Sequence, residues 1–286
     1  MQMNAVVNKN FYIEKSSQQL EVKLLVDFIN RRLKVVKYRC SDYDILCREL
    51  YRTAQKYKLE KILLIAKSDD WKKFFVKSFV LEALHPAFYD GEDGFHMSLF
   101  LAADRFKAEN YILHKKILQT VISHPKSKLK PLGQDFSIDS VARNDIKELT
   151  ELYSKIFKTY PTPINDPDYF KKMLHKDYIF KVVRYKGNIV SAASLDINMT
   201  DKNAELTDCA TLKDYGGKGL MANIIKALEQ EAKQKGLRTI YTIARACSIG
   251  INKVFYNQEY EYCGQLIKNC DICGQFEDMN VWSKII

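Results

Sequence analysis

Gly216, Gly217 and Gly219 stand just before a predicted helix that begins at Leu220 and ends at Gly236. The apolar residues of this segment have the spacing of one buried helix face, and glycine is suited to ending a helix. Without side chains above them, the backbone N–H groups of such a turn are accessible, and the positive end of the helix dipole points the same way. The turn therefore predicts a phosphate cradle; a plain tight turn is the alternative interpretation.

The elements around this turn have a definite order. We expect a strand over Ala204–Leu212 before it, and an apolar strand over Arg238–Ala244 after the helix. A short helix and two more strands follow at Ser248–Gln258, Tyr260–Ile267 and Asp278–Lys284. Strands that alternate with helices in this way indicate an α/β domain.

This order of strand, glycine turn, helix, strand, helix and strand resembles the acetyl-CoA-dependent N-acetyltransferase superfamily known as GNAT. Three segments resemble more closely the bacterial and archaeal β-lysine N6-acetyltransferases, which make the compatible solute N6-acetyl-β-lysine: TDCATLKDYGGKGL, IARACSIGINKVF and IKNCDICGQFEDMNVW. The resemblance covers the full chain. It implies the GNAT fold, with a mixed central sheet flanked by helices, and direct acetyl transfer from acetyl-CoA to the N6 amine in a ternary complex.

The glycine turn departs from the GNAT pattern Arg/Gln-x-x-Gly-x-Gly/Ala. Gly216 stands where the first Arg or Gln is expected, and Met221 stands at the last small position. The resemblance implies that Lys218 partly replaces the missing basic side chain, and that strand amides pair with the pantetheine arm and polarise the thioester. Cofactor contacts are expected at Ala210, Thr211, Leu212, Gly216, Gly217, Lys218, Gly219, Leu220 and Asn252.

The catalytic candidates lie on the central strand and on the last helix. Glu205 resembles the base in the AEI…CA strand of histone-type acetyltransferases, and Asp208 is the second candidate. A carboxylate with a raised pKa can take the proton of an ammonium group. The family often has a tyrosine as the acid in the last helix, but Phe255 stands there, so Tyr256 beside it is the candidate, with solvent or the released amine as alternatives.

The acceptor site is expected to involve the Pro-rich loop and two later segments. Tyr160 and Thr162 are candidate wall residues, although such a loop is also a common rigid connector. Arg245, just past a strand end, is suited to bind a substrate carboxylate. In the resembled family the NCDICG loop lies near the acceptor, so Asn269 and Asp271 are further candidates.

No metal site is predicted. Cys270 and Cys273 form a single CxxC pair, whereas a structural zinc site needs four ligands. None of the histidines has ligand spacing, and we expect them to be surface or core residues: His85, His96, His114, His124 and His175. Seven cysteines without framework spacing fit reduced thiols in a cytoplasmic protein.

The chain of 286 residues has room for two domains. KLEKILLIAK (58–67) aligns with GLRTIYTIAR (236–245), so residues 1–123 are expected to form a degenerate half of the GNAT fold, without the glycine turn, used for packing or dimerisation. They include a predicted helix over Arg105–Ser123. Residues 124–133 form a linker with two prolines, and residues 134–286 form the catalytic domain.

The net charge of +10 suits a cofactor with several phosphates, and the scattered lysines indicate solvated helix faces, so no nucleic-acid partner is expected. No apolar run is long enough to cross a bilayer, and no secretory signal is expected. The expected partners are a small-molecule amine and a second copy of the chain in a homodimer. Two alternatives stay open: another amine acceptor (a polyamine, lysine, aminoglycoside or peptide), or a non-catalytic acyl-CoA-binding regulatory module.

Overall fold

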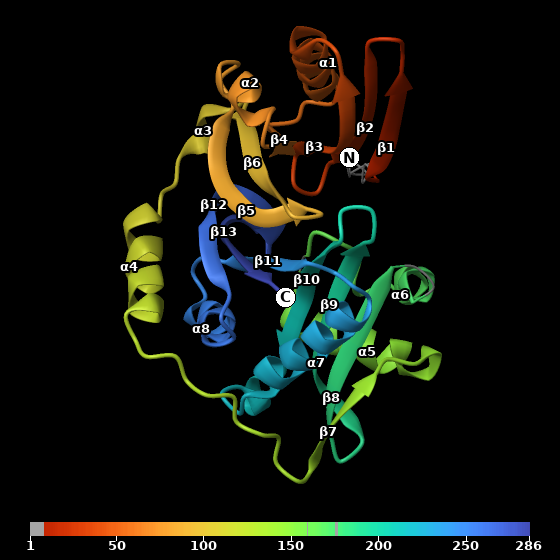
Figure 1. The fold of residues 1–286 in the computed structure, drawn as a ribbon. Helices are drawn as coiled ribbons and strands as arrows, with labels where there is room; N and C mark the ends of the chain where they lie inside the picture. Colours follow the sequence, from red (N-terminus) through yellow and green to blue (C-terminus); the bar gives the residue numbers. More distant parts are fainter. Residues whose placement is uncertain (1–8, 159, 175–176) are drawn as a thin grey trace, which may run out of the picture. The chain divides into compact units, whose positions relative to one another are not determined.

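The computed structural model describes residues 9–158, 160–174 and 177–286 (Figure 1). They divide into two units. Unit 1 holds the described residues up to Leu84 together with Gly94–Ala108, and unit 2 holds His85–Asp93 together with Glu109–Ile286.

The elements of unit 1 follow the alternation of apolar residues in its strands and the apolar stripe of its long helix. The strands are arranged in the order β1-β2-β3-β4-β6-β5. Leu46 and Leu50 of α1 are buried in a core with Leu33 and Ile62 from the neighbouring strands. The elements are β1 (Phe11–Ser16), β2 (Leu20–Asp27), β3 (Arg32–Cys40), α1 (Tyr43–Lys56), β4 (Lys61–Lys67), α2 (Trp71–Phe75), β5 (Val80–Tyr89), β6 (Glu92–Phe100) and α3 (Ala103–Phe106).

Unit 2 is built on the strand order β12-β13-β11-β10-β9-β8-β7. The pairing of β10 with β11 is parallel, and the pairings described for the other neighbours are antiparallel. The elements are α4 (Tyr111–Ile122), β7 (Phe136–Ser140), η1 (Arg143–Asp145), α5 (Ile146–Ile156), α6 (Pro167–Met173), β8 (Tyr178–Tyr185), β9 (Asn188–Asn198), β10 (Asn203–Thr211), η2 (Lys213–Tyr215), α7 (Leu220–Gln234), β11 (Thr239–Arg245), α8 (Ile249–Asn257), β12 (Glu261–Ile272) and β13 (Gln275–Ile285).

Helices cover both faces of this sheet (Figure 1). Ile224 and Leu228 of α7 are buried on one face with Val183 of β8. On the opposite face, Leu149 of α5 and Phe170 of α6 are buried in a second core together with residues of β8 and β9. Because successive side chains of a strand point to opposite faces, one run of apolar residues in β8 and β9 serves both cores. A mixed sheet between helices confirms the predicted fold class.

Two expected elements differ from the structure. The segment expected as a loop between the last two strands is mostly strand, because β12 continues to Ile272 and β13 begins at Gln275. The helix predicted over Arg105–Ser123 is interrupted, because Lys107 is extended and a second helix, α4, begins only at Tyr111. Helix α4 lies in unit 2, where Tyr256 of α8 donates a hydrogen bond to the carbonyl of Ile122 (3.0 Å). The domain boundaries predicted from the sequence, and the role expected for residues 1–123, stay predictions.

Candidate active site

The glycine turn leaves the start of α7 uncovered. Gly217 and Gly219 have φ angles of 73° and 77°, in the left-handed region that favours glycine. Gly219 is the N-cap of α7 and offers no capping side chain, and a Cβ on Gly217 would meet nothing within 4 Å. In the described part of the chain, the amides of Gly217, Gly219 and the first turn of α7 have no protein acceptor. They form the donor set that a phosphate group requires.

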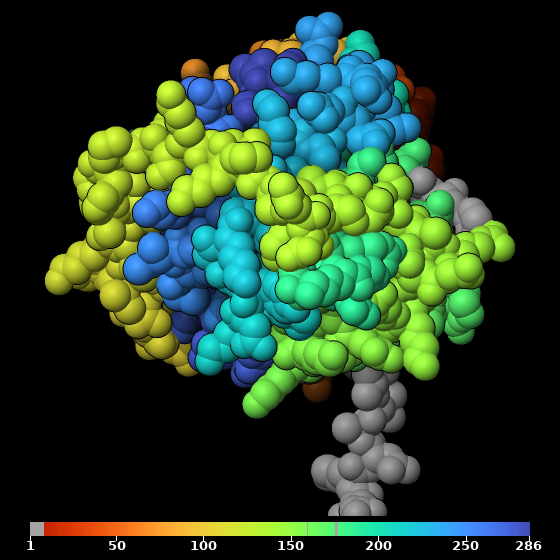
Figure 2. Space-filling model, turned by 90° about the horizontal axis from the view of Figure 1, so that it is seen from below, coloured from red at the N-terminus to blue at the C-terminus, as the bar shows by residue number. Residues whose placement is uncertain are grey.

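Basic residues accompany this turn. The ammonium group of Lys218 lies 5.1 Å from the centre of the Tyr215 ring. The linker at 124–133 passes the same helix end, because Asn223 of α7 donates a hydrogen bond to the carbonyl of Lys130 (2.9 Å). In Figure 2 the yellow-green linker lies beside the cyan turn. The linker backbone at Lys130 therefore lies close to the glycine turn, which the sequence did not indicate.

Strands β10 and β11 separate soon after they begin. Their parallel pairing holds for three residue pairs and ends at Glu205↔Tyr241. On the other side of β10, Thr207 pairs with Ser194 and Ala210 with Ala192, so two residues of β10 oppose one residue of β9 in a β-bulge. Asp208 lies in this bulge at φ 54°.

A pocket of about 200 Å³ lies where the two strands part. The amide of Leu212 donates to the carbonyl of Val190 (2.9 Å), so the amide of Thr211 points the other way, toward β11. The lining residues come from α5 and its loop, β10, β11, α8, β12 and β13: Ile156, Phe157, Tyr160, Leu206, Thr207, Asp208, Cys209, Ala210, Thr211, Thr242, Ile243, Ala244, Arg245, Ser248, Ile251, Phe255, Ile272 and Met279.

Asp208 is the buried carboxyl group of this pocket, with 5% of its surface exposed. Burial raises its pKa to about 6, and hydrogen bonds from Ser194 and Tyr160 oppose that rise. The Ser194 hydroxyl donates to Oδ2 (2.8 Å), and the Tyr153 hydroxyl donates to the backbone carbonyl of Asp208 (3.0 Å). The carboxyl group is therefore fixed in place and mostly ionised at neutral pH.

Glu205, the first candidate for the base, lies where the strands are still paired, and it is not among the pocket-lining residues. The Tyr241 hydroxyl donates to its Oε2 atom (3.3 Å), and Asp196 faces it from β9. The bulge explains the difference between the two carboxylates, because it turns Asp208 toward the pocket.

The two candidates on α8 have partners elsewhere in unit 2. The side-chain oxygen of Asn252 accepts from Asn280 (2.9 Å) and Trp282 (2.8 Å), and its nitrogen donates to the carbonyls of Arg245 (2.9 Å) and Ser248 (2.7 Å). These four bonds use all of its hydrogen-bonding capacity, so Asn252 joins α8 to the strands. Tyr256, with its hydroxyl on α4, does not line the pocket, whereas Phe255 does.

The expected acceptor residues are only partly brought together. Tyr160 and Arg245 line the pocket, and the hydroxyl of Thr162 is buried without a partner in the described part of the chain. The Arg245 guanidinium donates to Oε1 of Glu277 (2.7 Å), while its buried Nε has no partner among the described residues. Asn269 and Asp271 lie on β12 outside the lining.

Sequence reasoning missed Ser194, Tyr153 and Glu277. Each is distant in sequence from the residue it contacts, and nothing in their spacing indicates the contact. The buried pair of His114 and Asp278 (3.1 Å) was missed for the same reason.

Within the described ranges, no cluster of three or more His, Cys, Asp or Glu side chains could hold a metal ion, and all seven cysteines are free thiols. His175 lies outside the described residues. No helix in the described part of the chain is long and apolar enough to cross a membrane.

Several known proteins are similar to this chain in sequence. Residues 146–252 match the Acetyltransferase (GNAT) family. The chain is 32% identical to the N-acetyltransferase YodP of Bacillus subtilis over 258 residues, which cover 90% of this chain and 94% of that protein. It is 31% identical to the β-lysine N(6)-acetyltransferase of Methanococcus maripaludis over 263 residues, which cover 90% of this chain and 93% of that protein.

A solved structure of the spermidine/spermine N-acetyltransferase SpeG from Vibrio cholerae aligns with a TM-score of 0.48 and 16% identity, covering 54% of this chain and 95% of that chain. The extended matches to curated relatives confirm the resemblance seen in the sequence: the chain belongs to the GNAT acetyltransferase family and is an acyltransferase.

Proposed function

We propose that this enzyme transfers the acetyl group of acetyl-CoA to the N6 amine of β-lysine, in a ternary complex. The observation that carries the proposal is Asp208, a buried carboxyl group with a pKa of about 6 in the wall of a pocket between two parting strands. The relative named β-lysine N(6)-acetyltransferase supports this acceptor. Compatible-solute synthesis in the cytoplasm is the role that such a product suggests.

The residues around α7 fit the phosphates of acetyl-CoA. A Cβ on Gly217 would occupy open space in the turn, and the first-turn amides of α7 have no acceptor among the described residues. Gly216–Leu220 would hold the diphosphate, with Lys218 in place of the basic residue absent at Gly216.

The linker lysines Lys126, Lys128 and Lys130 would add electrostatic attraction for the phosphates. Replacing Lys128 and Lys130 by alanine should make the affinity for coenzyme A depend less on salt concentration, which calorimetry measures.

Acetyl-CoA supplies an activated thioester, and the strand edge would orient it. The amide of Thr211 faces the gap between β10 and β11, where it can donate to a carbonyl oxygen. The neighbouring backbone of Ala210 and Leu212 sets this direction through its pairing with β9.

Asp208 would take the proton of the incoming ammonium group. With a pKa of about 6 it is mostly ionised at pH 7, yet basic enough to share a proton with a positioned amine. Glu205 lies nearer the start of β10, and its negative charge would lower the electrostatic free-energy cost of binding a cationic substrate. Since Tyr256 is bonded to α4, we propose that solvent or the released amine returns the proton to the thiolate.

The pocket wall offers contacts for the rest of an amino-acid substrate. Arg245 has a buried Nε without a partner in the described ranges, and its guanidinium is suited to a carboxylate. Tyr160 and the Thr162 hydroxyl, which is buried without a partner in the same ranges, would complete the wall. Contacts of Asn269 and Asp271 with the acceptor, and a homodimer formed through residues 1–123, stay predictions that a substrate complex and sedimentation would test.

The acceptor is tested by comparing kcat/KM for β-lysine, α-lysine and 1,5-diaminopentane, which lacks a carboxylate. We expect β-lysine to be preferred over α-lysine by at least about tenfold. The variant Arg245→Gln should lose affinity for β-lysine and leave the rate with 1,5-diaminopentane nearly unchanged. Equal rates on α- and β-lysine would favour a different amine acceptor, the alternative left open by YodP, and acetyl-CoA binding without turnover on any amine would favour a regulatory module.

A further inference from the structure

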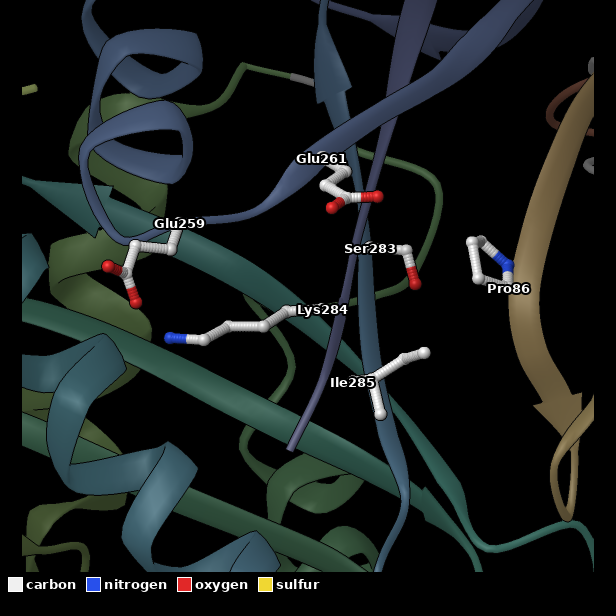
Figure 3. A pocket seen from close by; sticks show the side chains of 6 residues that line it. All are labelled: Pro86, Glu259, Glu261, Ser283, Lys284 and Ile285. Atoms are coloured by element: carbon white, nitrogen blue, oxygen red, sulfur yellow. The ribbon is translucent and has the colours of Figure 1, made fainter. Parts of the chain in front are cut away.

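We propose that unit 2 contains a second binding site, for a small aliphatic ammonium compound, outside the pocket between β10 and β11. The site is a pocket of about 230 Å³ beside the final residues of β13 (Figure 3). Its lining residues are Pro86, Glu259, Glu261, Ser283, Lys284 and Ile285.

Ser283 provides an unused polar group in this pocket. Its side chain is 2% exposed, and its buried hydroxyl has no hydrogen-bond partner in the described part of the chain. Leaving a buried hydroxyl unsatisfied is unfavourable, so a bound ligand that pairs with it gains a hydrogen bond that the described residues do not supply. Glu261 is its direct cross-strand neighbour, and Figure 3 shows the two side chains next to each other.

The pocket carries excess negative charge. Glu259 and Glu261 are exposed, and neither forms an ion pair among the described residues. The one cation in the lining, Lys284, is held by other partners: its ammonium group donates to Oε1 of Glu229 (2.9 Å), a carboxylate that Lys226 also contacts (3.7 Å), and to the carbonyl of Gln258 (2.8 Å). The lining therefore holds two carboxylates and a single ammonium group that is bonded elsewhere.

These groups match an aliphatic ammonium ion better than a metal ion. An ammonium group has three donors, which suit the Glu261 carboxylate and the Ser283 oxygen, and Pro86 and Ile285 offer an apolar surface to methylene groups. Calcium takes six to eight oxygen ligands, more than this pocket supplies. The ligand class is thus a short alkyl amine or diamine.

The test uses the full chain and 1,5-diaminopentane, in calorimetry without acetyl-CoA, with backbone NMR shifts to locate the ligand. We expect shifts at Glu261, Ser283 and Lys284, and affinity for that site at least about fivefold weaker in Glu261→Gln and in Ser283→Ala. Glu151→Gln, which removes an exposed carboxylate of α5, should bind like the wild type.

Shifts confined to the pocket that holds Asp208, or unchanged affinity in Glu261→Gln, would overturn the site. If Ser283→Ala unfolds, Glu259→Gln at an exposed position provides the same comparison. No acetyl transfer enters this measurement, so its failure leaves the proposed reaction untouched.

Discussion

The helices that connect the parallel strands of each unit, α1 between β3 and β4 and α7 between β10 and β11, begin in opposite ways. At α1 the carboxylate of Asp42 accepts hydrogen bonds from the amides of Asp44 (2.7 Å) and Ile45 (3.4 Å). At α7 the N-cap is Gly219, without a side chain and without an acidic residue in the first turn. The positive end of one helix is satisfied by the protein, and that of the other is left for an anion.

The surrounding architecture is otherwise shared. In unit 1, β3 and β4 pair in parallel for three residue pairs beginning at Arg32↔Lys61, as β10 and β11 do beginning at Asn203↔Thr239. Strand β3 also has a bulge, at Val36, but no carboxylate stands in it. In the proposed mechanism the strand framework is not sufficient for acetyl transfer, since unit 1 has a similar framework but a capped helix start and no carboxylate in its bulge.

The largest effect is expected from giving α7 the cap of α1. Gly219→Asp places a carboxylate where the diphosphate would bind and should weaken acetyl-CoA binding by about 1,000-fold, or about 4 kcal/mol. Gly219→Asn is the matched control, since asparagine has the same shape, tolerates a positive φ and carries no charge; it should cost about tenfold. Calorimetry measures both, and equal losses would refute the role of charge at this helix start.

The next largest effect is expected at Asp208, the acid in the bulge of β10. Asp208→Asn should lower kcat about 100-fold at pH 7 and leave acetyl-CoA affinity within about twofold, because only the proton acceptor is removed. In the wild type, kcat should fall as the pH drops through about 6, where Asp208 becomes protonated. Glu205→Gln serves as the comparison on the same strand. A larger loss in Glu205→Gln than in Asp208→Asn would reverse the proposed assignment.

The ionised form of Asp208 should lower the free energy of unfolding. Its pKa rises from 3.8 to about 6 on folding, so the folded state holds this proton more tightly than the unfolded chain. The contribution of this bound proton to the free energy of unfolding is present at low pH and is lost as the pH rises from about 4 to above 6. Asp208→Asn should therefore be more stable than the wild type at pH 8 by on the order of 1–3 kcal/mol, with little difference at pH 4. Urea unfolding at the two pH values measures this, and a less stable variant at pH 8 would contradict it.

The smallest effect belongs to α1. Asp42→Ala removes its cap and should lower the free energy of unfolding by about 1 kcal/mol. Acetyl-CoA affinity should not change, because this helix start is not expected to bind phosphate. A change in affinity as large as that of Gly219→Asn would show that the two helix starts are not as different as their caps indicate.

Much of the catalytic framework was predictable from the sequence. The glycine turn, the amphipathic α7 and the apolar β11 are local patterns, and each is decided by the residues that form it. The echo between residues 58–67 and 236–245 aligns β4 with β11, and only the structure shows that both strands begin a short parallel pairing at the aligned positions Lys61 and Thr239. The helix predicted over Arg105–Ser123 was wrong at Lys107, where periodicity alone could not show the break.

The site itself depends on contacts between distant residues. By period two, the sequence places Asp208 on the opposite face from Glu205, and only the bulge opposite Ser194 turns it into the pocket wall. Burial among Tyr153, Tyr160 and Ser194 then sets its pKa. The hydrogen bonds of Asn252 and Tyr256 likewise depend on partners from other elements. Local spacing determined where a phosphate could bind, whereas the tertiary structure decided which carboxyl group faces the pocket, because a bulge and a desolvated side chain exist only once distant strands and helices have packed together.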